Sequence, residues 1–142
     1  MTDSEQIGLM AEVAVEKLLR KKFPKLNICW TRRERRNNAP FDFELYDRVH
    51  CVGLIEVKGF GIGRKWYWTQ YKRPQIKRKL RRAKELKDWH KEMPPMATIV
   101  VKIHDEERIG MRWEFGFPSQ PFTDFNESFT KLWQEIKKRV CL

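Results

Sequence analysis

Residues 41–58 contain two runs that are typical of neighbouring strands in one β-sheet. The first run, FDFELY, alternates apolar and polar side chains, as expected for a strand with one buried face. The second run, residues 50–58, is mostly apolar, and the short connection at residues 47–48 favours antiparallel pairing of the two strands. The chain therefore has to build a sheet, and its second strand has to accommodate Glu56 and Lys58 within an apolar run.

The rest of the sequence surrounds these two strands with helices and further strands. Ser4 is expected to cap the first helix and Asp124 the last, and Pro74 suits the first turn of the middle helix. Helices are predicted over residues 4–22, 74–90 and 124–140, and strands over residues 26–31, 41–46, 50–58, 96–103 and 110–117. The order αβββαββα predicts one α/β domain over residues 1–142, with a central mixed β-sheet flanked by helices.

Positive charge is concentrated in one segment. The formal net charge is +11, and residues 64–91 hold twelve Lys and Arg against two acidic residues, a local charge of +10. Such a segment is typical of a protein that binds a polyanion such as nucleic acid. A basic helix on a membrane surface is the competing interpretation, and the narrow apolar stripe of this segment disfavours it.

Cysteine usage and hydropathy indicate an intracellular protein. No stretch approaches the roughly 18 apolar residues of a membrane span, and residues 1–6 are polar with no hydrophobic signal segment after them. Cys29, Cys51 and Cys141 lack the spacing of a disulfide framework or a zinc site, so they are expected to be small buried side chains in a reducing compartment. The expected location is the cytoplasm, without membrane association.

The strand period of two assigns side chains to opposite faces of the sheet. The alternating run is expected to turn Phe41, Phe43 and Leu45 to one face. It turns Asp42, Glu44 and Tyr46 to the other. Glu56 and Lys58, two residues apart on the next strand, share one face of the sheet for the same reason.

Asp42 can therefore lie opposite Glu56, with Lys58 one pleat repeat away. Two carboxylates about 4 Å apart repel by about 4 kcal/mol at an effective dielectric constant of 20. The pair is stable if one carboxyl is protonated or if a divalent cation lies between them, and magnesium suits such a site. Glu12, at the edge of the apolar arc of the first helix, could add a ligand directly or through water.

The same residues also have an ordinary structural interpretation. A Glu-Val-Lys triplet in a strand is most often solvent-facing, and Glu12 is equally consistent with a boundary glutamate. The combination of Glu56 and Lys58 with Asp42 on the preceding strand favours a catalytic or metal-binding site over solvent-exposed surface residues.

Four short motifs in the chain match one known family in order and spacing. They are Gly8-x-x-x-Glu12, Pro40-Phe41-Asp42, Glu56-Val57-Lys58 and Lys72-Arg73-Pro74-Gln75. The chain resembles the PD-(D/E)XK nuclease superfamily, and within it the archaeal-type Holliday junction resolvases, from about residue 5 to residue 103.

This resemblance implies a restriction-endonuclease-like core and a magnesium-dependent endonuclease, with manganese as a substitute metal. It implies a homodimer that cuts branched double-stranded DNA at four-way junctions, one active site for each strand. The implied metal-binding residues are Glu12, Asp42, Glu56 and Val57. Lys58 would assist the nucleophilic water and Gln75 would support the site.

Basic and aromatic residues around these motifs are expected to hold the DNA. Phosphate contacts of this kind position a backbone without reading bases. Trp66 and Trp68 could stack on exposed bases at a branch point, or they could equally be packed in the core or at a dimer interface. The expected DNA-binding residues are Arg32, Arg33, Arg35, Arg36, Arg64, Lys65, Trp66, Trp68, Lys72, Arg73 and Lys77.

Three functions are consistent with the sequence. The first is a junction-resolving endonuclease. The second is another nuclease of the same superfamily, of the phage end-trimming, restriction or repair type. The third is a non-catalytic nucleic-acid-binding module, which the acidic residues disfavour because they would repel phosphate unless a metal lies between them.

Overall fold

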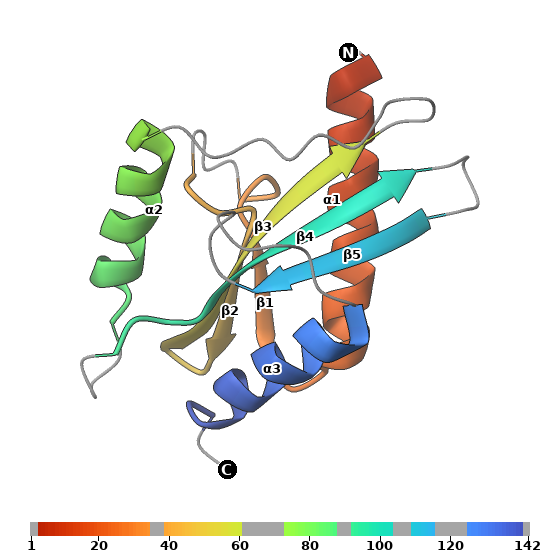
Figure 1. The fold of residues 1–142 in the computed structure, drawn as a ribbon. Coiled ribbons are helices and arrows are strands. Elements are labelled where there is room, and N and C mark those ends of the chain that lie inside the picture. Colours follow the sequence, from red (N-terminus) through yellow and green to blue (C-terminus); the bar gives the residue numbers. More distant parts are fainter. Residues whose placement is uncertain are drawn as a thin grey trace.

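The structure is a computed structural model, and it describes residues 3–34, 39–60, 73–87, 92–103, 109–115 and 125–140. Three helices and five strands follow one another along these segments (Figure 1). In chain order they are α1 (Asp3–Lys22), β1 (Asn27–Trp30), β2 (Phe43–Asp47), β3 (His50–Phe60), α2 (Arg73–Glu85), β4 (Met96–Ile103), β5 (Ile109–Phe115) and α3 (Phe125–Lys137).

The strands form one mixed sheet in the order β1-β2-β3-β4-β5. β3 and β4 run parallel, and the other neighbouring pairs are antiparallel. Phe43 of β2 lies opposite Ile55 of β3, so the predicted antiparallel pairing of these two strands is confirmed. The expected α/β class, with a mixed sheet flanked by helices, is confirmed as well.

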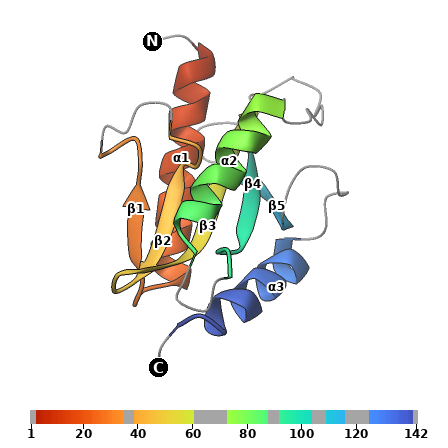
Figure 2. The same ribbon diagram turned by 90° about the vertical axis from the view of Figure 1, so that its left-hand side faces the viewer.

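The helices cover the two faces of the sheet unequally. α1 and α3 lie on one face, where Val15 and Leu132 join the larger apolar cluster together with Ile55 and Val57 of β3. α2 lies across the opposite face, near β2 and β3 (Figure 2). The result is a three-layer arrangement in which β3 is covered from both sides.

Two predicted helix boundaries differ from the observed ones. α1 begins at Asp3, so Ser4 lies within its first turn and is not the N-cap. α2 ends at Glu85, several residues before the predicted end near residue 90. Pro74 does lie in the first turn of α2, where a missing N–H leaves no intrahelical hydrogen bond unmade. The predicted cap Asp124 lies outside the described residues.

The predicted alternation of the 41–46 run is wrong at Phe41, and the burial of Glu44 was not predicted. Phe41 packs with Cys51, Leu54 and other residues on the α2 side of the sheet, apart from the larger cluster. Glu44 lies on the face opposite Phe43 and Leu45, as predicted, but it is only 1 % exposed. The reason is that β2 begins only at Phe43 and that α2 covers the face to which the polar side chains point.

Cysteine burial agrees with the sequence where the structure describes it. Cys29 and Cys51 are buried free thiols, and Cys141 lies outside the described residues. Among the helices of the described segments, none has the length and apolar character needed to cross a membrane.

Gly59 is the place where α1 approaches β3 most tightly. A Cβ atom on Gly59 would lie 2.9 Å from the Cβ of Ala11 and 3.1 Å from the carbonyl oxygen of Ile7. The missing side chain therefore lets α1 lie directly against β3, which brings Glu12 toward the strand that carries Glu56.

We predict that Gly59→Ala destabilises the protein by about 1–3 kcal/mol, because the added methyl group would overpack the contact with α1. Gly8→Ala is the matched control, since nothing lies within 4 Å of a Cβ at Gly8. That control should stabilise the protein by up to about 1 kcal/mol through helix propensity. Denaturant unfolding measures both, and an equal effect of the two variants would refute the close-approach interpretation.

Candidate functional site

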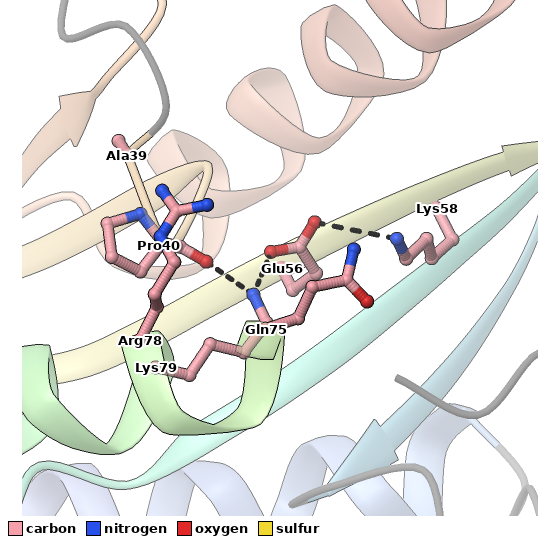
Figure 3. Close-up of a pocket in the computed structure, with 7 residues that line it drawn as sticks. All are labelled: Ala39, Pro40, Glu56, Lys58, Gln75, Arg78 and Lys79. Carbon is pink, nitrogen blue, oxygen red and sulfur yellow. Dashed lines mark hydrogen bonds and ion pairs between the residues drawn. The ribbon is translucent and has the colours of Figure 1, made fainter. Parts of the chain in front are cut away.

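β3 presents its two charged side chains to a pocket beneath α2. Ile55 and Val57 are buried on the α1 side, and Glu56 and Lys58 point to the opposite side, as the strand period predicts. The pocket is lined by Ala39, Pro40, Glu56, Lys58, Gln75, Arg78 and Lys79 (Figure 3). The site thus combines β3, the first turns of α2 and the segment that leads into β2.

Backbone hydrogen bonds fix Asp42 just before β2. Its N–H donates to the carbonyl of Ile55 at 3.0 Å, and its carbonyl accepts from the N–H of Thr31 at 3.0 Å. The Thr31 hydroxyl also donates to the carbonyls of Phe41 and Asp42, at 3.0 and 3.1 Å. Asp42 is therefore held between the end of β1 and β3.

The Asp42 carboxylate lies against β3. Its Oδ2 accepts a hydrogen bond from the Val57 N–H at 2.7 Å. Burial raises the pKa of Asp42 well above its usual range, and the neighbouring negative charges of Glu56 and Glu12 raise that pKa further, while the Val57 N–H partly opposes the rise. The structure therefore brings Asp42 and Glu56 together, as the sequence predicts, and the pair resists carrying two negative charges.

Two lysines approach Glu56 from different elements. The Lys79 ammonium, on α2, lies 2.5 Å from Glu56 Oε2 and also donates to the carbonyl of Pro40. The Lys58 ammonium lies 3.9 Å from Glu56 Oε1, and its side chain is 40 % exposed (Figure 3). Lys58 is thus positioned at the open side of the pocket, whereas Lys79 is buried.

Glu12 is held on the α1 side of the sheet by two partners. Its Oε1 accepts hydrogen bonds from the Trp30 indole at 3.0 Å and from Arg32 Nε at 3.2 Å, and its Oε2 lies 2.6 Å from Arg32 Nη2. The hydrogen bond to Glu12 raises the pKa of Arg32. Glu12 is close enough to raise the pKa of Asp42, but its carboxylate is oriented by Arg32 and Trp30.

The predicted DNA-binding residues divide into three groups. Arg32 is bound to Glu12, and Arg33 contacts Glu16 at 2.9 Å and lies over the Trp30 ring, while each keeps about half of its side chain exposed. Lys77 is exposed on α2 and Arg73 begins that helix. Outside the described residues lie Arg35, Arg36, Arg64, Lys65, Trp66, Trp68 and Lys72.

Gln75 and Arg78 form the wall of the pocket on α2. Both side chains are exposed, and both line the pocket opposite Glu56 and Lys58. The structure therefore places Gln75 with the other predicted site residues. Arg78 was not singled out from the sequence, because it has the same type and spacing as its basic neighbours.

A second polar cluster anchors α2 and is not part of the pocket. Arg82 donates to both carboxylate oxygens of buried Glu44, at 2.8 and 2.9 Å, and the Tyr46 hydroxyl donates to Glu44 at 2.8 Å. Burial and this hydrogen bond raise the pKa of Tyr46, and burial raises the pKa of the Cys51 thiol to about 12. At least one arginine of the basic segment, Arg82, is therefore paired with a buried carboxylate within the fold.

Lys79 was missed by sequence reasoning, although a signal was present. It stands three residues after Ile76 and four before the buried Ala83, and so falls within the narrow apolar stripe of α2. A lysine inside such a stripe has to find an acidic or carbonyl partner when it is buried.

The donor set at the pocket fits magnesium in part. Within the described segments, no group of three or more His, Cys, Asp or Glu side chains is arranged to hold a metal ion. Asp42 and Glu56 nevertheless adjoin each other, and magnesium typically takes one or two carboxylates and keeps several waters. These two residues are therefore the ones that would hold the ion, with Val57 contributing only its main chain because its side chain faces the core.

The chain matches no protein-family model, and neither a curated protein nor a solved structure is significantly similar to it.

We predict that Asp42→Asn stabilises the protein in the presence of EDTA at neutral pH, by about 1 kcal/mol or more. The substitution removes the repulsion between Asp42 and Glu56, and the side-chain oxygen of Asn can still accept the Val57 hydrogen bond. Thermal unfolding measures the change, which corresponds to a rise in Tm of about 3 °C.

The pH dependence of stability provides a control for this prediction. The pKa of Asp42 is higher in the folded than in the unfolded state, so its contribution is largest at acid pH and is lost as pH rises through the folded value. Asp42→Asn should flatten this fall between acid and neutral pH. Lower stability of the variant across that range would show that the Asp42 charge is not repelled in the fold.

Proposed function

We propose that the protein is a metal-dependent endonuclease of the PD-(D/E)XK type that hydrolyses phosphodiester bonds in branched DNA. The observation that carries this proposal is the Asp42–Glu56 carboxylate pair, with the Lys58 ammonium 3.9 Å from Glu56 at the open side of the pocket. A buried like-charge pair costs stability, and such pairs are concentrated at functional sites.

Asp42, beside the pocket, and three side chains that line it have distinct roles in this reaction. Asp42 and Glu56 would hold magnesium, which supplies a hydroxide nucleophile from bound water near neutral pH and offsets charge on the phosphate. Lys58 is placed to position the attacking water and to stabilise the developing negative charge. Gln75, across the pocket from Lys58, can donate a hydrogen bond to the same phosphate or water.

The order of elements supports a restriction-endonuclease-like core. In the resembled family, the aspartate precedes one strand and the Glu-x-Lys motif lies on the next, as Asp42, Glu56 and Lys58 do here. The helix that follows bears the glutamine, as α2 bears Gln75. We infer a four-way junction as substrate and a homodimer as the active form, because two sites are needed to cut two strands together.

Positive charge next to the pocket supports DNA as the substrate. Lys77 and Arg78 are exposed on the same helix that forms the pocket wall. Arg32, bound to Glu12, and Arg33, bound to Glu16, follow the end of β1 and keep about half of their side chains exposed. Exposed cations beside a carboxylate pair can hold a phosphate backbone near it.

We predict that Asp42→Asn and Glu56→Gln abolish cleavage of a four-way DNA junction in magnesium and leave binding equal or tighter. Both changes remove negative charge that repels phosphate, and both remove a metal-binding oxygen. The measurement compares four-way, forked, single-stranded and duplex DNA with magnesium or EDTA, together with binding of each DNA.

Glu92→Gln is the control for these variants, because Glu92 is an exposed carboxylate that does not line the pocket. It should cleave at the wild-type rate. Magnesium-dependent cleavage by either site variant at that rate would refute the assignment of the site. A wild-type protein that binds junctions and cuts none of the four DNAs would favour a non-catalytic binding module.

We predict that Lys58→Ala lowers the turnover number about 100-fold or more and changes DNA binding little. The expectation follows from a side chain that acts on the nucleophilic water in the transition state. Lys84 is an exposed lysine on α2 that does not line the pocket, so Lys84→Ala is the control that removes the same charge elsewhere. Equal losses of turnover and DNA affinity in Lys58→Ala would make Lys58 a phosphate contact only.

A further inference from the structure

Lys79 is an unusual member of the basic helix because its ammonium is buried. Only 5 % of the residue is exposed, whereas Lys77 and Lys84 on the same helix are exposed. Taking an ammonium group out of water costs several kcal/mol unless it is paired and hydrogen-bonded. A DNA-binding role does not require that cost, because a phosphate contact has to be reachable from solvent.

The contacts of Lys79 join three parts of the site. Its ammonium donates to Glu56 on β3 and to the carbonyl of Pro40 (Figure 3). It also lies 4.6 Å from the centre of the Phe41 ring. Pro40 stands two residues before Asp42. One side chain of α2 thus holds one carboxylate of the pair directly and the chain segment that carries the other.

We propose that Lys79 is a positioning residue that also sets the metal affinity of the site, an inference that rests on the proposed nuclease function. By binding Glu56 and the Pro40 carbonyl together, Lys79 fixes the Glu56 carboxylate relative to the segment that leads to Asp42. Lys58 cannot replace it, since the Lys58 ammonium lies farther from Glu56 and its side chain is 40 % exposed.

The charge of Lys79 opposes metal binding while its geometry supports catalysis. A fixed positive charge beside Glu56 reduces the negative potential that attracts a divalent cation to the pair. The same ammonium pairs with the Glu56 carboxylate and holds it in place. Lys79 therefore weakens metal binding but holds the Glu56 carboxylate in a defined position.

Two substitutions separate these effects. Lys79→Met removes both the charge and the hydrogen bonds, and Lys79→Gln removes the charge but keeps an amide that can donate to Glu56 and Pro40. Both variants should bind manganese about tenfold more tightly than the wild type, because a nearby positive charge is gone. Titration calorimetry without DNA gives this dissociation constant independently of activity.

Turnover should distinguish the two variants. At saturating metal, Lys79→Met should lower kcat on a four-way junction about 10- to 100-fold with little change in KM, because the Glu56 carboxylate loses its fixed position. Lys79→Gln should retain more of the turnover. If Lys79→Met does not fold, metal affinity and turnover of Lys79→Gln carry the test.

Lys84→Met is the matched control, since it removes a positive charge from the exposed side of the same helix. Its manganese affinity and kcat should equal those of the wild type. Unchanged or weaker manganese binding in both Lys79 variants would overturn the inference, as would equal tightening in Lys84→Met. A wild-type protein that binds no manganese would instead refute the proposed metal site, so the two failures are distinguishable.

Discussion

The hydrogen bond from the Val57 N–H to the Asp42 carboxylate, at 2.7 Å, is the contact on which the arrangement of the site depends. It holds Asp42 beside Glu56 although burial and the neighbouring charge of Glu12 oppose a second negative charge there. The sheet cannot relax this conflict by a change of register. A slip of one residue would turn Ile55 and Val57 out of the core, which is a larger loss than the repulsion saved.

The basic side chains of α2 fall into an inward group and an outward group. Lys79 and Arg82 turn inward, where each is paired with a carboxylate of the sheet, Glu56 or Glu44. Both pairs hold the helix against β2 and β3, and in such pairs removal of one partner is expected to be costly. The exposed side chains of Lys77 and Arg78 remain available for phosphate. One helix therefore stabilises the fold, forms the wall of the pocket and provides the charge for a polyanion.

The α1 side of the sheet supports the same site from behind. Gly59 allows α1 to lie against β3, and Glu12 then reaches the end of β1, where Trp30 and Arg32 bind it. Arg32 stands at the start of the arginine-rich segment that leads to Asp42. A phosphate that binds Arg32 would compete with Glu12 for the Arg32 guanidinium. Arg32 therefore links the charge of Glu12 to that of a bound phosphate.

The sequence by itself determined the type and order of most elements, and the common face of Glu56 and Lys58, because a strand period of two is a local property. It also placed Asp42 near Glu56, since a short connection leaves little choice of pairing. Only the tertiary structure decided that Phe41 packs on the α2 side, that Glu44 is buried and that Lys79 enters the pocket. The physical reason is that periodicity shows which side chains share a face, whereas burial of that face depends on which other element packs over it.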